Sequence, residues 1–201
     1  MSGEIDFQKV YEEYQPKIAR YLSRLTGRDE AEDMAQDVFE KVHLGLAGFE
    51  GRSKLSTWIY RIATNTALDK LRSRSFIRLT DIKPLEENQN IEDRNVWTGQ
   101  TRTPVDQELI SREMNSCIRG YVEKLPTDYK TVIILSEIEG FRNTEIAEIL
   151  EASLETVKIR LHRARARLKK ELEAHCTFYQ NERNVLACDI KTALEKPEKS
   201  D

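Results

Sequence analysis

Apolar side chains recur every three or four residues over most of the chain, the spacing that is typical of amphipathic helices. Residues 7–25 form the first such stretch, and Gly27 is expected to end it. Residues 31–46 form the second, with Asp29 as a candidate N-cap. A third helix is expected over residues 56–74, with Ser56 as its candidate N-cap. Since no convincing alternation of a β-strand is found, the pattern predicts an all-α fold.

The helical periodicity stops between residues 76 and 104, where Pro, Gly, Asn, Gln and acidic residues prevail. Such a composition is typical of a linker with little fixed structure. We therefore predict two small helical domains, residues 1–75 and 105–173, joined by a flexible linker. Residues 174–201 form a C-terminal extension, which we expect to be helical or frayed.

Helical spacing returns over residues 105–122, and a further helix is expected to end at Gly140. Residues 144–150 form a short amphipathic helix, and Glu151 and Ala152 follow it as a tight turn. The candidate N-caps of the three helices after residue 126 are Thr127, Asn143 and Ser153. Two helices joined by a tight turn, the second of them basic, are the layout of a helix-turn-helix.

The second helix of this pair has the side chains that a major-groove helix needs, because donors near its start can reach base edges and phosphates. Val157 and Leu161 are expected to face inward. The candidate DNA-contacting residues are Ser153, Glu155, Thr156, Lys158, Arg160, Arg163 and Arg165. The alternative is an ordinary helical hairpin with a solvated basic face, because charged stretches of helix are usually just solvated.

The third helix places aromatic side chains beside arginine and asparagine, a combination that suits single-stranded nucleic acid. Rings stack on exposed bases, amides read base edges and guanidinium groups hold the backbone. The residues concerned are Trp58, Tyr60, Arg61, Thr64, Asn65 and Arg72. The alternative is that Trp58 and Tyr60 are core residues of a helical bundle.

One face of the second helix is polar and mostly acidic, opposite Met34, Val38 and Val42. It consists of Asp33, Gln36, Asp37 and Glu40. Such a face could dock on a basic helical partner, or it could simply be solvated.

Composition changes this picture mainly through the distribution of charge. Lys and Arg number 32 against 35 Asp and Glu, which gives a net charge of −3 and argues weakly against nucleic-acid binding. The charges are segregated, however, since residues 158–170 contain seven basic residues and no acid. There is no long apolar run and no signal peptide at the N-terminus, so we expect a cytoplasmic protein.

In their order and spacing these segments resemble σ factors of the σ-70 family. Residues 31–39 resemble region 2.2, and residues 51–72 resemble regions 2.3 and 2.4. Four further segments resemble regions 4.1 and 4.2: residues 125–132, 139–140, 145–147 and 156–165. Nothing in the linker resembles regions 1.1 or 3, which points to the extracytoplasmic-function group.

The resemblance implies a protein that binds core RNA polymerase, at the β′ clamp helices and the β flap, and directs it to promoters. By resemblance, Asp33, Gln36, Asp37 and Glu40 would dock on the clamp helices. The basic helix would read the −35 element as duplex DNA, and the loop from residue 49 to 56 would hold a flipped base. The residues expected to capture the −10 strand are Arg52, Trp58, Tyr60, Arg61, Thr64, Asn65, Asp69 and Arg72. An anti-σ protein is the expected regulator, and neither a cofactor nor a metal is expected.

The chain departs from the family pattern around its helix-turn-helix. Many members have Gly in the turn where Glu151 and Ala152 stand, Gly at the position of Glu155, and Ser at that of Ile159. A carboxylate at Glu155 would repel phosphates unless it accepts from a cytosine amine or caps the helix. These differences bear on base preference rather than on the fold.

Two other functional classes were weighed. A helix-turn-helix regulator that never joins core polymerase is the main alternative, although such proteins usually carry a second ligand-binding or receiver domain. An enzyme is disfavoured, because the three histidines are scattered and no HExxH or phosphate-binding loop is present; Asp33 and Asp37 could in principle bind Mg²⁺. His175, Cys176 and Cys188 could bind a metal or form a redox pair, but no fourth ligand or CxxC spacing accompanies them.

Overall fold

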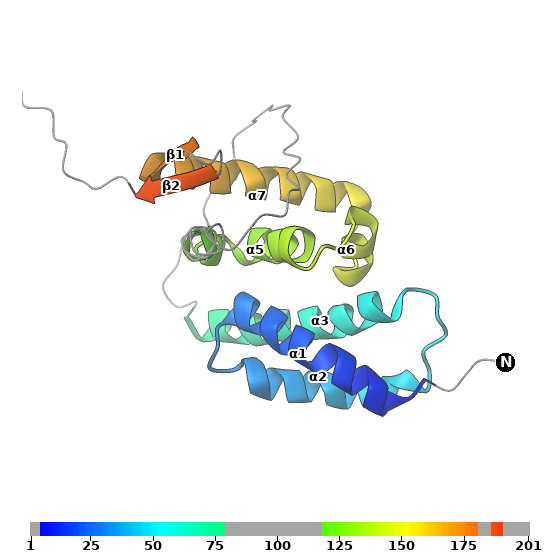
Figure 1. The fold of residues 1–201 in the computed structure, drawn as a ribbon. Helices are drawn as coiled ribbons and strands as arrows, with labels where there is room; N and C mark the ends of the chain where they lie inside the picture. Colours follow the sequence, from blue (N-terminus) through cyan, green and yellow to red (C-terminus); the bar gives the residue numbers. More distant parts are fainter. Residues whose placement is uncertain (1–4, 79–117, 181–185, 191–201) are drawn as a thin grey trace, which may run out of the picture.

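The computed structural model describes residues 5–78, 118–180 and 186–190, and the predicted all-α class is confirmed. The helices form two layers (Figure 1). The first layer contains α1 (Phe7–Thr26), α2 (Ala31–Leu46) and α3 (Leu55–Arg78). The second contains α5 (Thr127–Ile133), the π-helical turn η1 (Ile134–Ile138), α6 (Asn143–Ile149) and α7 (Leu154–His175), with residues 118–123 also helical. Most of the predicted linker lies outside the described residues, and its first positions continue α3.

The core of the first layer is formed by the apolar stripes that the sequence predicted. Ile18, Leu22, Val38 and Val42 are all completely buried between α1 and α2. As predicted, Gly27 ends α1, and its φ of +103° lies in a region that favours glycine.

Two of the predicted caps in this layer are wrong. The position before α2 is occupied by Glu30 and not by Asp29, and no side-chain hydrogen bond caps the helix there. Helix α3 already begins at Leu55, so Ser56 lies inside its first turn. Helix ends depend on the loop geometry around them as well as on the capping side chain, which explains errors of one and two residues.

Helix α3 crosses the first layer on the side that faces the second layer (Figure 1). Ile59, Ala63 and Ala67 are completely buried, as the predicted stripe requires. A buried hydrogen bond of 2.8 Å between the hydroxyls of Tyr21 and Thr64 ties α3 to α1.

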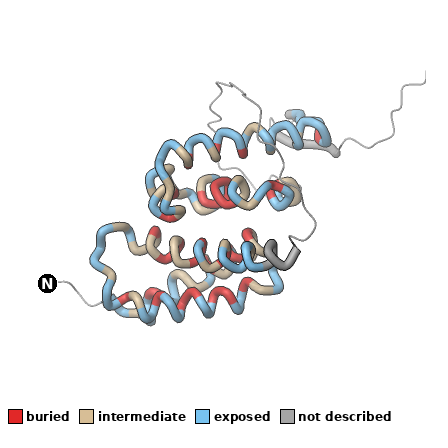
Figure 2. The backbone as a smooth tube through the Cα atoms, turned by 180° about the vertical axis from the view of Figure 1, so that it is seen from behind, coloured by how far each residue is buried: buried red, intermediate tan, exposed pale blue. Residues whose placement is uncertain are grey.

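In the second layer, α5 and η1 supply the buried centre against which α6 and α7 pack (Figure 2). The residues buried there include Val132, Leu135, Ile146, Ile149, Val157 and Leu161. Gly140, with a φ of +75°, follows η1 where the helix was predicted to end. The predicted caps Thr127 and Asn143 are each one residue late, because Pro126 and Arg142 occupy the N-cap positions.

The C-terminal extension contains a feature that the sequence analysis missed. Strands β1 (Cys176–Gln180) and β2 (Leu186–Ile190) pair antiparallel, so the expectation of a helical or frayed tail without strands is wrong here. Each strand has only five residues, too few for an alternating pattern to stand out from the helical one before it. Cys176, which is 2 % exposed, lies at the junction with α7.

The two layers are in contact through α3 and α6, and more weakly through α1 with α5 and η1. The sequence led us to expect separate modules on a tether. The structure keeps two helical units but packs one face of α3 against the second of them, which affects several predicted DNA contacts.

Candidate nucleic-acid interface

Helix α7 begins with a capped turn, as the sequence predicted. The Ser153 side chain accepts a hydrogen bond from the Thr156 backbone N–H at 3.1 Å, and the two hydroxyls are 2.8 Å apart. Both predicted DNA-contacting hydroxyls therefore help to start the helix. Val157 and Leu161 are buried as predicted, which turns the polar side of α7 toward solvent.

The basic side of α7 is open along its length. Lys158 and Arg163 are exposed, and so is Glu155. The other two predicted arginines form ion pairs within the second layer: Arg160 with Asp128 at 3.3 Å and Arg165 with Glu137 at 2.5 Å. Ion pairs between such exposed side chains contribute only about 0–1 kcal/mol, so a phosphate could replace either carboxylate at little cost.

The predicted residues of α3 divide into an open and a covered set. Asn65, Asp69 and Arg72 are exposed. Arg72 Nη1 lies 3.4 Å from Asp69 Oδ1, so these two side chains form an ion pair. Arg52, in the preceding loop, is also exposed and pairs with Glu50 at 2.5 Å. These four residues are directly accessible to a ligand in this structure.

Trp58 is partly buried at the start of α3. Its ring lies 5.3 Å from that of Phe49, measured between centroids, and it covers the backbone of Gly45 so closely that an added Cβ would be 2.9 Å from it. Trp58 is thus held by α2 and by the loop that precedes α3, beside the position where the family resemblance expects a flipped base.

Tyr60 and Thr64 are inside the protein. Tyr60 is 4 % exposed. The centroid of its ring lies 5.1 Å from that of Tyr21 and 4.7 Å from that of Phe141. Its hydroxyl donates a hydrogen bond of 2.7 Å to Glu139. Burial, and then this bond to a carboxylate, raise the pKa of Tyr60 above its ordinary value. Thr64 is completely buried and donates to the Tyr60 carbonyl at 2.6 Å. In this arrangement Tyr60 is a core residue, which is the alternative that the sequence left open.

Arg61 is partly buried and poorly paired. Its nearest acidic partner is Glu151, at 3.9 Å, in the turn before α7. Its Nε is buried and has no hydrogen-bond partner among the described residues. A buried donor without a partner is unfavourable by roughly 1–3 kcal/mol, so Arg61 is held in this position at some expense in free energy.

The four residues of the predicted acidic face, Asp33, Gln36, Asp37 and Glu40, are all exposed along α2. Two of them also line a shallow groove that the sequence did not predict, although its apolar residues Phe7, Tyr11 and Phe39 belong to the predicted helical stripes. Tyr11 and Phe39 meet there edge to face at 5.0 Å. The groove is lined by Phe7, Tyr11, Gln36, Phe39, Glu40 and His43.

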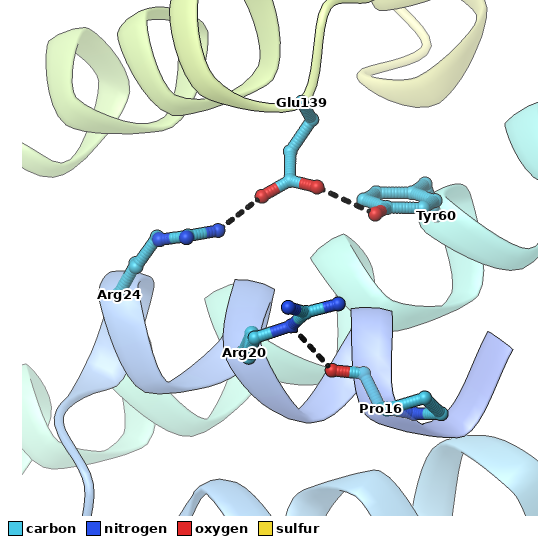
Figure 3. A network of polar contacts seen from close by, with 5 residues as sticks. All are labelled: Pro16, Arg20, Arg24, Tyr60 and Glu139. Atoms are coloured by element: carbon cyan, nitrogen blue, oxygen red, sulfur yellow. Dashed lines mark hydrogen bonds and ion pairs between the residues drawn. The ribbon is translucent and has the colours of Figure 1, made fainter. Parts of the chain in front are cut away.

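Glu139 is the residue that sequence reasoning missed most clearly. It accepts hydrogen bonds from Arg24 Nη1 and from the Tyr60 hydroxyl, both at 2.7 Å, and so joins the two layers (Figure 3). The same view shows Arg20 donating to the Pro16 carbonyl on the adjacent turns of α1. No local pattern could reveal Glu139, because its partners are 115 and 79 positions away.

A second ion pair between the layers joins Lys54 to Glu145 at 2.7 Å. The hydrogen bond from Lys54, and then that from the Arg142 backbone N–H, hold the pKa of the Glu145 carboxyl below its usual value. Glu145 thus caps α6 and contacts the loop before α3 at the same time.

Of the candidate metal ligands in the C-terminal extension, the structure describes the side chains of His175 and Cys176. His175 Nδ1 lies 2.9 Å from the Glu171 carbonyl, and in the strand register Cys176 is opposite Ile190 while Cys188 is opposite Phe178. Within the described residues no three His, Cys, Asp or Glu side chains are grouped as a metal site would require. None of the helices in the described ranges has the length and apolar character needed to span a bilayer.

Comparisons with known proteins agree with this geometry. The profile of σ-70 region 2 matches residues 10–77, and that of σ-70 region 4 matches residues 115–168. The chain is 34 % identical over 169 residues to the ECF RNA polymerase σ factor SigW of Bacillus subtilis, covering 83 % of this chain and 88 % of SigW. It is 37 % identical over 176 residues to the RNA polymerase σ factor YlaC of the same organism, covering 86 % and 95 %.

Two solved structures share the fold. One is the σ factor RpoE of Bartonella quintana in complex with the anti-σ factor NepR, with a TM-score of 0.59, 24 % identity, and coverage of 84 % of this chain and 97 % of that one. The other is CnrH in complex with the cytosolic domain of CnrY, with a TM-score of 0.56, 22 % identity, and coverage of 84 % and 88 %. From its motifs, its two helical units and these relatives, the chain belongs to the extracytoplasmic-function group of the σ-70 family and directs promoter-specific transcription initiation.

Proposed function

We propose that α7 reads the −35 element as duplex DNA, that α3 captures the non-template strand of the −10 element, and that α2 docks on core polymerase. The proposed modules are residues 1–75 and 105–173. The observation that carries the proposal is the exposed basic side of α7, which follows a capped turn and is backed by Val157 and Leu161. An N-terminal helix half with free donors is what entry into a major groove requires.

On the −35 element, Lys158 and Arg163 would contact DNA directly, and Arg160 and Arg165 would exchange their carboxylates for phosphates or base edges. The polar residues Ser153, Glu155 and Thr156 would lie at the groove end of the helix. Arg160→Ala should weaken binding to a −35 duplex by about 1–3 kcal/mol if the guanidinium reads a base. Arg28→Ala, which removes an exposed arginine from the first layer, is the matched control. An unchanged affinity in Arg160→Ala would remove this residue from the interface.

On the −10 element, Arg52, Asn65, Asp69 and Arg72 would make the first contacts, and Trp58 would border the flipped base. Extruding a base requires a few kcal/mol, and each stacked base returns about 1–3 kcal/mol, so several contacts together could open the strand without ATP. Asn65→Ala should impair binding of single-stranded −10 DNA and leave binding to core polymerase intact. Loss of core binding instead would mean that α3 has another partner. Arg61, which is partly exposed, would add a phosphate contact, Tyr60 would join only after the second layer moves away, and Thr64 would act from inside the first layer by positioning Tyr60.

On core polymerase, the acidic face of α2 would meet the β′ clamp helices, and the second layer would meet the β flap. The decisive experiment is promoter-specific transcription with purified bacterial core polymerase on promoters of the native genome. The wild-type chain should permit initiation, and Asp37→Arg should prevent it by reversing one charge of the docking face. If the wild-type chain supports no initiation on any such promoter, the protein is a regulator that does not join the polymerase.

An anti-σ protein would regulate the chain by covering these surfaces; the structurally similar RpoE of Bartonella quintana was solved in complex with an anti-σ factor, NepR. The site of action would be the cytoplasm, where polymerase and promoter DNA meet. The proposed role consists of binding steps alone, so neither enzymatic activity nor a cofactor or metal is part of it.

A further inference from the structure

The second layer covers Tyr60 on α3 and contacts the neighbouring Arg61, which stays partly exposed. Tyr60 contacts Phe141 and Glu139, and Arg61 faces Glu151. Phe141 and Glu139 flank the glycine that ends η1, so one short segment supplies most of the cover. A nucleotide strand cannot use the ring and hydroxyl of Tyr60 while these contacts are in place.

Glu139 is the centre of this cover. Its side chain is 11 % exposed and accepts one bond from Arg24 of α1 and one from Tyr60 of α3. Bonds of this kind, between an ionised carboxylate and nearby donors, are about twice as strong as neutral ones. The π-helical turn η1 sets its position, because the Glu139 N–H donates to the Ile134 carbonyl at 3.0 Å. Such turns are rare and often occur at functional sites.

Other contacts indicate that the cover is removable. The Lys54–Glu145 pair is 2.7 Å long, but the lysine side chain is 71 % exposed, so solvent screens the interaction. The Arg61–Glu151 pair is 3.9 Å long and the glutamate side chain is 64 % exposed, so this pair also adds little to closure. Among the described residues, the bonds of Glu139 are therefore the strongest polar contacts that hold the two layers together.

We propose that Glu139 is a latch that keeps the free chain closed, with the strand-capturing side of α3 covered, and that the −10 strand binds only after this latch opens. In the closed form α7 lies on the side of the second layer away from α3 (Figure 1), and its basic residues Lys158 and Arg163 are exposed. The closed chain can thus meet −35 duplex DNA but cannot capture a −10 strand. This inference rests on the proposed function of α3.

The test uses the full chain with Glu139→Ala, and with Arg24→Ala as a second variant from the opposite layer. Glu148→Ala is the matched control, because it removes an exposed carboxylate from α6. The probe is a single-stranded oligonucleotide with the non-template −10 sequence of a promoter mapped by sequencing transcripts after overexpression. Apparent affinity is the intrinsic affinity reduced by the closed fraction, so Glu139→Ala should bind the strand roughly tenfold more tightly.

Arg24→Ala should act in the same direction, and the double variant should gain less than the product of the two single gains, because both remove one contact. Binding of −35 duplex should stay unchanged in every variant, as should strand binding in Glu148→Ala. Small-angle scattering of the free chain should give a larger radius of gyration for Glu139→Ala than for the wild type, with no DNA involved.

An unchanged radius of gyration in both latch variants overturns the latch, and so does unchanged or weaker strand binding in variants that still support initiation with core polymerase. Failure of the wild-type chain to initiate at any promoter overturns the proposed function instead, and the scattering comparison still decides whether Glu139 holds the layers together.

Discussion

Substitution of Gly45 by alanine tests whether Trp58 is held in place by α2. Gly45 lies in the last turn of α2, directly under the indole ring. A Cβ built at this position would be 2.9 Å from Trp58 Cζ2 and 3.3 Å from Cη2. Side-chain carbons essentially never approach so closely, so alanine must displace the indole or shift the helix.

Two opposing effects set the size of the change. Replacing glycine by alanine inside a helix is favourable by roughly 0.5–1 kcal/mol, because the unfolded chain loses freedom. Forcing an extra methyl group into a packed site is unfavourable by about 1–3 kcal/mol. We therefore expect Gly45→Ala to lower the free energy of unfolding by up to about 2 kcal/mol.

Gly120→Ala is the matched control, because Gly120 is also helical and no atom of the described residues lies within 4 Å of its added Cβ. It should stabilise the protein by about 0.5–1 kcal/mol. Thermal unfolding of both variants, followed by circular dichroism, measures the difference; 1 kcal/mol corresponds to about 2–4 °C in a chain of this size. If Gly45→Ala stabilises the protein as much as Gly120→Ala does, the close packing of Trp58 on α2 is refuted.

Two further substitutions test local features. Glu151 has a φ of +50°, so Glu151→Gly should raise the melting temperature by relieving about 1 kcal/mol of backbone strain, whereas Ala152→Gly should lower it; equal shifts would contradict the strain. Tyr21→Phe removes the buried bond to Thr64 and should reduce the free energy of unfolding in denaturant by about 0.5–1.5 kcal/mol. A loss above about 3 kcal/mol would show that Thr64 is not kept satisfied by its bond to the Tyr60 carbonyl.

The candidate site was predictable where it depends on neighbours along the helix. The basic side of α7 and the acidic face of α2 follow from the period of 3.6 residues, which assigns Val157 and Leu161 to the core and their neighbours to solvent. Helix ends were less predictable, since Glu30, Pro126 and Arg142 occupy N-cap positions without being the most favoured residues there.

The sequence by itself determined the helices of both layers, their buried stripes and the order of the σ-factor motifs, because these depend on residues within a few turns of one another. Only the tertiary structure decided which polar face of α3 is open. Asn65 and Arg72 stay exposed while Tyr60 is buried, because Glu139 reaches its hydroxyl from a segment 79 positions away. Contacts over such separations come from how whole helices pack, and no local pattern of residues encodes that choice.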